Sequence, residues 1–336
     1  MHQRIYYFDF LNIIACIAVI ALHHNGIVHT FTPTHHWNQA LFVEVICYWA
    51  VPIFFMLSGA TLMDYRKRYS TKKFFIQRIK RTLIPFIFWS IVAGTIHCYI
   101  NKEIPTFHLY IYKIFNTEFQ NVYWFFLPLF GIYLLTPILN LLKDKRDILI
   151  YLLIIISLQE GILMPLYKLL EVEPIGRNSI SGPILFFILG YLLSTTTKQI
   201  NKKVLIIVSI FCLILRYIVT YKFSYINNET YKLLFGYYYF TSIIPAITIF
   251  VYVKDKFPTK NKESINNILK NVSSYSFGVY LIHMYIILIE LKILNNISLE
   301  NTWWGFRTFM VLITYITCVI IVHIIKKSRI GKFILP

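Results

Sequence analysis

A pair of histidines, His23 and His24, lies three-quarters of the way along an apolar stretch near the amino end, residues 7–28. Ionisable side chains within a membrane helix are costly, so they indicate a functional site by default. Imidazole takes up and returns a proton near neutral pH, and this chemistry activates a hydroxyl toward an acyl carbonyl. His283 lies about 11 residues into the apolar run 272–291, near mid-depth. We expect it to share a cavity with His23; the alternative is that each histidine makes only a structural hydrogen bond to a neighbouring helix.

Polar side chains follow one face of the first apolar stretch. At about 100° per residue, Asp9, Asn12, Cys16 and His23 fall close together around a helix. His24 points about 100° away from His23 and is therefore expected to have a structural role. The spacing predicts a polar seam along a membrane helix, ending at His23.

Two arginines, Arg78 and Arg81, form the second group of residues that could take part in binding or catalysis. They are three residues apart in a basic stretch, 65–85, so on a helix their guanidinium groups can converge on one anion. A pair of arginines suits phosphate or diphosphate, such as the nucleotide part of coenzyme A. The alternative is that they only anchor the end of a membrane helix. The position of the two arginines in the fold, rather than their charge, distinguishes these possibilities.

The elements that position these side chains are membrane helices. The 336 residues are 57% hydrophobic and only 14% charged, with a mean hydropathy of +0.61, which is typical of a polytopic membrane protein. We predict an all-α bundle of about ten transmembrane helices and no separate soluble domain. The apolar runs lie near residues 7–28, 38–63, 82–101, 122–142, 148–167, 180–196, 203–221, 233–253, 272–291 and 304–325.

The distribution of basic residues predicts the orientation of the bundle. With the connections assigned alternately to the two sides, 24 of the 33 Lys and Arg fall on the side of the termini and seven on the other. Both termini are therefore expected in the cytoplasm. On that basis His23 lies roughly 22 Å into a hydrocarbon core of roughly 30 Å, nearer the outer face.

Composition also argues against several other classes of site. The net charge of +18 is explained by topology and by attraction to anionic lipid headgroups, so we expect membrane lipids and no nucleic acid as partners. The cysteines are scattered without a C-x-x-C pair and are expected to be small core residues. Three outer histidines, His29, His35 and His36, fit no regular ligand spacing, so we expect no metal.

Short motifs follow one another along the first part of the chain. The pattern Asp-x-Leu, with a histidine twelve residues beyond the Leu, is formed by Asp9, Leu11 and His23. The pattern Pro-x-Phe-Phe-x-x-Ser-Gly occupies residues 52–59. Arg78 and Arg81 then form Arg-x-x-Arg.

Later motifs complete the series. They are Pro85 and Trp89 after the arginines, the aromatic run 123–127, the Tyr-Leu-x-x-Pro run 133–137, Gly190-Tyr191, and the Ser-Tyr-x-x-Gly-x-Tyr-Leu-x-His run ending at His283. In this order, and over nearly the whole chain, they resemble the integral-membrane acyltransferases called acyltransferase type 3, which O-acylate cell-surface glycans and related acceptors.

The resemblance implies one integral-membrane acyltransferase domain over residues 1–336, with acyl-CoA taken from the cytosol as donor. His23 matches the family's essential histidine and would act as general base or as a relay that carries the acyl group. Arg78 and Arg81 would bind the donor's phosphates. Asn12 stands where the family commonly has Arg or Lys, so any donor contact there is neutral or is supplied by another residue.

Further site residues follow from the resemblance and from their depth. Trp89 and Asn12 are assigned to the donor site with the two arginines. Glu44 and His283 are assigned to the catalytic group, Glu44 to orient His23 or to contact the acceptor. Glu44 has the alternative of an ordinary interfacial carboxylate. Glu160 and Glu290, inside apolar runs, either line the cavity or are paired structurally.

Two functions fit these residues. The first is an O-acyltransferase of the cell membrane that moves an acetyl group from cytosolic acetyl-CoA to a hydroxyl of an extracytoplasmic glycan, such as capsule, exopolysaccharide or another envelope polymer. The second is a polysaccharide exporter or flippase of the intercellular-adhesin export type. A transporter is expected to show repeat symmetry and broken helices with charged residues at mid-membrane, and no internal repeat is visible in the sequence. The sequence does not specify the acceptor sugar or the oligomeric state.

Overall fold

The computed structural model describes residues 4–172, 181–257, 263–296 and 304–336. Within these ranges the chain is helical and has no β-strand. Its α-helices are, in order, α1 Tyr6–His24, α2 His35–Cys47, α3 Ala50–Leu62, α4 Thr71–Arg78, α5 Ile84–Asn101, α6 Phe107–Phe115, α7 Phe126–Leu139, α8 Arg146–Leu158, α9 Met164–Leu169, α10 Ser181–Thr195, α11 Lys202–Asn227, α12 Phe240–Lys256, α13 Glu263–Ser273, α14 Ser276–Asn296, α15 Trp304–Ile325 and α16 Arg329–Ile334. Two π-helical turns, Ile79–Leu83 and Gln159–Leu163, join α4 to α5 and α8 to α9.

The predicted class, an all-α polytopic membrane protein, is confirmed. Eight helical segments of the described chain are long and apolar enough to cross a bilayer: Tyr6–His24, His35–Lys67, Thr71–Asn101, Asn121–Leu142, Arg146–Leu169, Lys202–Asn227, Ser276–Leu294 and Arg307–Ile325. The other two predicted helices, 180–196 and 233–253, correspond to α10 and α12, and residue 180 lies outside the described residues. α12 begins only at Phe240 because residues 231–239, around Gly236, form turns. The cytoplasmic location of both termini stays a prediction.

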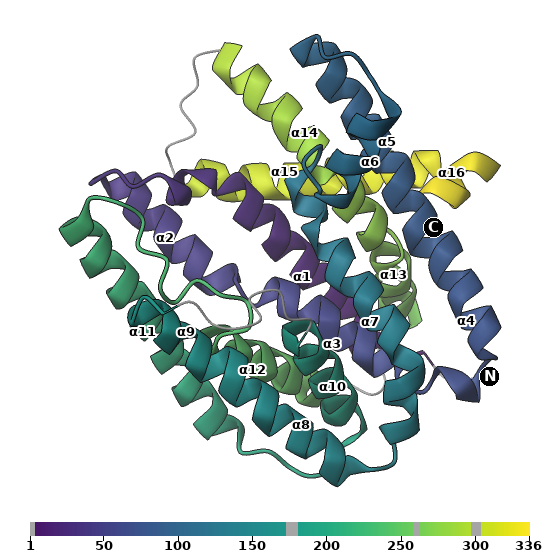
Figure 1. Cartoon of the computed structure of the whole chain (residues 1–336), viewed down its shortest axis with the longest axis vertical. Coiled ribbons are helices and arrows are strands. Elements are labelled where there is room, and N and C mark those ends of the chain that lie inside the picture. Colours follow the sequence, from purple (N-terminus) through teal and green to yellow (C-terminus); the bar gives the residue numbers. More distant parts are fainter. Residues whose placement is uncertain (1–3, 173–180, 258–262, 297–303) are drawn as a thin grey trace.

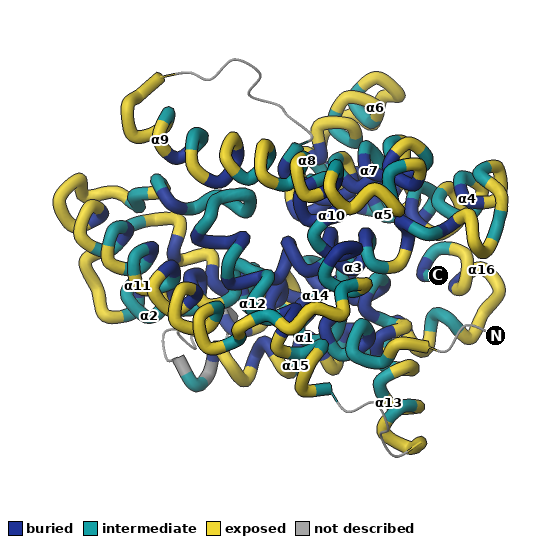
Figure 2. Tube along the Cα trace, turned by 90° about the horizontal axis from the view of Figure 1, so that it is seen from below, coloured by how far each residue is buried: buried dark blue, intermediate teal, exposed yellow. Residues whose placement is uncertain are grey.

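α1 lies at the centre of the bundle and packs against α2, α3, α12, α13, α14 and α15 (Figure 1). Buried residues gather along the central helices, whereas α6 and α11 are exposed over most of their length (Figure 2). The exposed side chains of α11 include Ile207, Ile210 and Phe211. An exposed apolar face of this kind suits contact with lipid chains rather than with water.

α3 and α10 are held together backbone to backbone by two glycines. A Cβ atom on Gly59 would lie 1.8 Å from the carbonyl oxygen of Phe187, and one on Gly190 would lie 1.9 Å from that of Met56. The two helices are antiparallel, since the higher residue number on one meets the lower on the other. Small residues permit such close approach in membrane bundles. The packing fixes α3, whose motif at residues 52–59 faces the site described below.

Several chain segments that are distant in sequence meet at one end of the bundle. The start of α1, the junction of α4 with α5, the end of α15 and all of α16 lie around a common space. α16 packs against α5, and the C-terminus lies beside α16 in Figure 1. The seam predicted along α1 therefore begins at this end of the bundle.

Candidate functional site

His23 and His283 form a hydrogen-bonded pair at the carboxyl end of α1. Nδ1 of His23 lies 2.8 Å from Nε2 of His283, and the two rings stack with their centroids 4.9 Å apart. His283 is fully buried, whereas His23 is partly exposed. The structure therefore brings together the two histidines that the sequence placed in different helices.

The hydrogen bonds of His283 define which nitrogen of His23 is free to act as a base. Nδ1 of His283 lies 2.6 Å from the backbone carbonyl oxygen of Tyr280, and a carbonyl can only accept. In the neutral ring, Nδ1 of His283 must therefore donate and its Nε2 must accept. Nδ1 of His23 is then the donor, which leaves the lone pair on Nε2 of His23. This tautomer assignment follows from the bonding network.

Two tyrosines fix the position of α14, which carries His283. The hydroxyl of Tyr123 donates to the carbonyl of Leu281 at 2.7 Å. In return the hydroxyl of Tyr280 donates to the carbonyl of Val122. Residues 122 and 123, just before α7, thus hold the segment of α14 that immediately precedes His283.

His24 belongs to a different network from His23. Its Nε2 lies 2.7 Å from the hydroxyl oxygen of Thr314 on α15, and Thr314 lies 2.6 Å from a carboxylate oxygen of Glu290 on α14. His24 Nε2 is 3.5 Å from the same oxygen of Glu290. The adjacent histidines therefore have different partners, His283 for His23 and Thr314 with Glu290 for His24, as expected from the 100° step between them.

Glu44 is buried on α2 against the turn that follows His23. Its carboxylate accepts from the amide of Asn25 at 3.3 Å, and His283, rather than Glu44, is bonded to His23. The fully buried Arg216 lies nearby, with its guanidinium carbon 4.8 Å from the ring centroid of Tyr48. The role predicted for Glu44 toward the acceptor stays a prediction.

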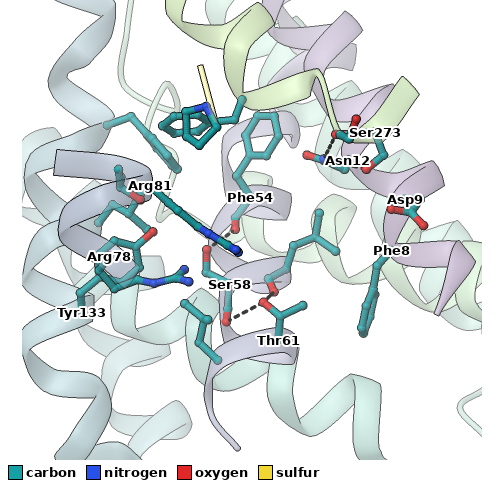
Figure 3. A pocket seen from close by; sticks show the side chains of 18 of the residues that line it. Phe8, Asp9, Asn12, Phe54, Ser58, Thr61, Arg78, Arg81, Tyr133 and Ser273 are labelled. Carbon is teal, nitrogen blue, oxygen red and sulfur yellow. Dashed lines mark hydrogen bonds between the residues drawn. The ribbon is translucent and has the colours of Figure 1, made fainter. Parts of the chain in front are cut away.

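Arg78 and Arg81 line a pocket of about 750 Å³ at the end of the bundle where α1, α4, α15 and α16 meet. In Figure 3 the two arginines extend from one side and Asn12 with Ser273 lies on the other, while Phe54, Ser58 and Thr61 of α3 lie between them. The guanidinium carbon of Arg78 lies 5.5 Å from the ring centroid of Tyr133. The pocket is wide enough and basic enough to receive a phosphorylated ligand.

The α1 side of the pocket carries Asp9 and Asn12. Asn12 donates to the hydroxyl of Ser273 at 3.0 Å, so its amide is held but adds no charge. Asp9 accepts two hydrogen bonds of 2.7 Å from Arg4. This bidentate contact raises the pKa of Arg4 and compensates the charge of Asp9.

An aromatic layer separates the pocket from the histidine pair. Phe54, Phe125 and Phe277 line the pocket, whereas neither histidine does. The ring of Tyr280 bridges the two regions, since its centroid is 5.6 Å from that of Phe125 and 5.6 Å from that of His283. These rings lie between the pocket and His283.

Trp89 lies on α5 beside the pocket but is not one of the residues that line it. Its indole nitrogen donates to the carbonyl of Ile334 at 3.1 Å, which attaches α16 to α5. Its own carbonyl accepts from the hydroxyl of Tyr285 at 3.0 Å. A contact of Trp89 with the donor stays a prediction. In the structure Trp89 holds α16, one of the elements that line the pocket, against α5.

Comparison with known proteins assigns the chain to a family. The sequence model of the family described as an acyltransferase domain matches residues 5–323. The chain belongs to this acyltransferase family. Neither the curated proteins nor the solved structures gave a significant match.

The family match and the apolar helices together make the chain a multi-pass membrane acyltransferase. Within it, two cationic side chains of the pocket were not singled out by sequence reasoning: Lys326, just after α15, and Lys332 in α16. Their types gave no signal, because lysines at the end of a membrane helix are common anchors. In the described part of the chain, no three His, Cys, Asp or Glu side chains lie together as a metal site would require.

Proposed function

We propose that this membrane acyltransferase moves an acetyl group from cytosolic acetyl-CoA to a hydroxyl of an extracytoplasmic glycan at the cell membrane. The observation that carries the proposal is the pair His23–His283, in which a hydrogen bond of 2.8 Å leaves Nε2 of His23 as the free base. The pocket around Arg78 and Arg81 supports an acyl-CoA donor.

The chemistry follows from that tautomer. Nε2 of His23 takes the proton of the acceptor hydroxyl, and the hydroxyl oxygen attacks the thioester carbonyl carbon. The tetrahedral intermediate collapses with cleavage of the carbon–sulfur bond, and the coenzyme A thiolate leaves with the proton from His23. His283 stabilises the imidazolium by accepting from Nδ1 of His23 throughout. One ester and one thiol form from one thioester and one alcohol.

The two substrates approach the histidines from opposite ends. Asn12 and His23 are 11 residues apart on α1, so roughly 16 Å separates the nucleotide pocket from the base. The pantetheine arm spans this interval past the rings of Phe54, Phe125 and Tyr280. The enzyme then moves the acyl group through the bundle, while the glycan stays outside.

An aromatic stack near Glu44 supports a sugar acceptor. The rings of Tyr48 and Tyr237 stack with centroids 4.2 Å apart, and Trp124 continues the stack at 5.4 Å from Tyr237. Ligand sites are commonly lined by aromatic side chains with a few polar groups, and a carboxylate accepts hydrogen bonds from sugar hydroxyls. We assign this group, with Glu44, to the acceptor side.

The test uses membranes that contain the full chain, labelled acetyl-CoA and the envelope glycan of the host cell. The wild type is expected to deposit base-labile label on the glycan, and His23→Ala to lose roughly 10²- to 10⁴-fold in rate while remaining folded in the membrane. His24→Ala, next to it in the chain, is the matched control and keeps the activity. Full transfer by His23→Ala would contradict the base role.

The exporter alternative makes a different prediction for the same variant. An exporter needs no base, so His23→Ala would still deliver glycan to the cell surface, and cells without the protein would retain glycan inside. The acyltransferase predicts surface glycan in normal amount that lacks its ester-linked acyl groups. Chemical comparison of the surface glycan with and without the protein separates the two.

A further inference from the structure

The donor pocket has a second basic wall besides Arg78 and Arg81. Lys326 and Lys332 both line it. Both lysines lie beyond residues 5–323, the part of the chain that the family model matches. The family match therefore assigns them no role, and only their place in the pocket points to one.

The charge of a coenzyme A donor requires more than two cations. A 3′-phosphomonoester carries about −1.5 to −2 at pH 7, and the diphosphate adds one charge from each of its two phosphates. Arg78 and Arg81 match the diphosphate and leave the phosphomonoester without a counter-charge. Asp9 does not change this balance, because Arg4 already binds it through two hydrogen bonds of 2.7 Å.

Lys326 lies in the turn between α15 and α16, and Lys332 lies in α16 itself. This part of the chain is fixed in place. A Cβ atom on Gly331 would lie 1.6 Å from the carbonyl oxygen of Ile325, so α16 folds tightly against the end of α15. The Ser328 hydroxyl caps α16 by accepting from the backbone N–H of Gly331 at 2.8 Å. Trp89 holds the other end of α16 through the carbonyl of Ile334. A phosphate contact on this turn costs little ordering of the backbone.

Lys326 is also directed by its own contacts. Its ammonium donates to the carbonyl of Ser274 at 3.1 Å and lies 5.4 Å from the ring centroid of Tyr275. Partial burial lowers the pKa of Lys326, and an anion in the pocket would restore a favourable environment for its charge. On the α1 side the pocket offers no cation, because it carries Asp9, which Arg4 already binds, and the neutral amide of Asn12, bonded to Ser273.

We propose that Lys326 and Lys332 form the subsite for the 3′-phosphate of the coenzyme A donor, while Arg78 and Arg81 bind its diphosphate. This assignment rests on the proposed function, because it takes acyl-CoA as the donor. It gives the pocket two further cations, one just after α15 and one in α16, where Asn12 on α1 supplies no charge.

The test compares binding of coenzyme A and 3′-dephospho-coenzyme A to the purified full chain in detergent. Charge-assisted hydrogen bonds to one phosphate correspond to about a tenfold to hundredfold preference for coenzyme A in the wild type. Lys332→Met, an exposed position, is expected to lose most of that preference, and the double variant with Lys326→Met to lose all of it. Affinity for the dephospho analogue stays unchanged and reports that the variants are folded. Lys327→Met, which removes the same charge outside the pocket lining, is the control.

A rescue experiment sharpens the assignment. Asn12→Arg in the double variant restores a cation to the same pocket and is expected to recover much of the affinity for coenzyme A. If the wild type prefers coenzyme A and both lysine variants keep that preference, the lysine subsite is wrong while the donor site stands. If the wild type binds neither compound, the acyl-CoA donor itself is wrong, and the proposed function fails with the subsite.

Discussion

The donor pocket and the histidine pair are built in opposite ways. The pocket is an open space of about 750 Å³ whose cations come from three separate segments. The histidine pair is instead defined by its hydrogen bonds: His283 is fully buried, and both of its ring nitrogens are bonded, one to Tyr280 and one to His23. One region is arranged to receive a large anion, and the other to hold one proton acceptor in a fixed orientation.

This difference predicts how mutations divide between binding and chemistry. A side chain that only contacts the nucleotide stabilises the ground state and the transition state equally, so its loss raises KM. A group that fixes the base acts in the transition state, so its loss lowers kcat. The aromatic layer of Phe54, Phe125 and Phe277 keeps the two regions apart, and their effects should be separable.

The largest effect in this comparison is expected at His283. His283→Ala removes the acceptor for Nδ1 of His23 and leaves the base without a fixed tautomer, so kcat should fall about 10²-fold with little change in the KM for acetyl-CoA. His283→Gln can place an amide oxygen near the same nitrogen and should recover part of kcat. Steady-state transfer from labelled acetyl-CoA measures both.

A merely structural role for His283 would give a different pattern. Both variants would then lose thermal stability, and the Gln side chain would not restore kcat selectively. His24→Gln is the matched control at the next position, since its partners are Thr314 and Glu290. An equal loss of kcat in His24→Gln would remove the distinction drawn between the two networks.

A smaller effect, on KM rather than on kcat, is expected at Arg78. Arg78→Ala removes one charge-assisted phosphate contact from the pocket, so the KM for acetyl-CoA should rise about tenfold to hundredfold with kcat nearly unchanged. Lys80→Ala, in the π-helical turn that follows Arg78 but outside the pocket lining, is the control for charge. The same kinetic assay tests it, and a fall in kcat without a rise in KM would place Arg78 in the chemistry instead.

Much of this arrangement could be predicted from α1 alone. The spacing of Asp9, Asn12 and His23 gave one face, and the structure places the first two on the pocket and the third against His283. Residue type and helical periodicity are enough to predict which side chains share a face, because that arrangement depends on one helix alone. The apolar runs placed His23 nearer the outer face and His283 near mid-depth, and the structure shows the two rings in contact.

The partners across helices could not be read in the same way. Periodicity does not say which helix packs on which, so neither the Tyr123 bond to the Leu281 carbonyl nor the contact of Glu44 with Asn25 was foreseen. Lys326 and Lys332 were counted with the cytoplasmic charges, because an anchoring lysine and a ligand-binding lysine have the same sequence signal. Only the fold, in which α16 packs back onto α5, shows that these two lysines line the pocket.

The smallest effect is expected at Trp89, which connects the comparison to that last helix. Trp89→Phe keeps an aromatic ring but loses the hydrogen bond of 3.1 Å to the carbonyl of Ile334, so the free energy of unfolding should fall by about 1 kcal/mol. Because α16 carries Lys332, the KM for acetyl-CoA should also rise, by about twofold to threefold, while kcat stays at the wild-type level. Thermal unfolding in detergent and steady-state kinetics measure the two changes.

Direct stacking of Trp89 on the donor predicts a different result: a rise in KM as large as that of Arg78→Ala, without loss of stability. Lys332→Met in the Trp89→Phe background distinguishes direct stacking from an effect through α16. If Trp89 acts through α16, the second substitution adds less than it does in the wild type, since residues in one network are not additive.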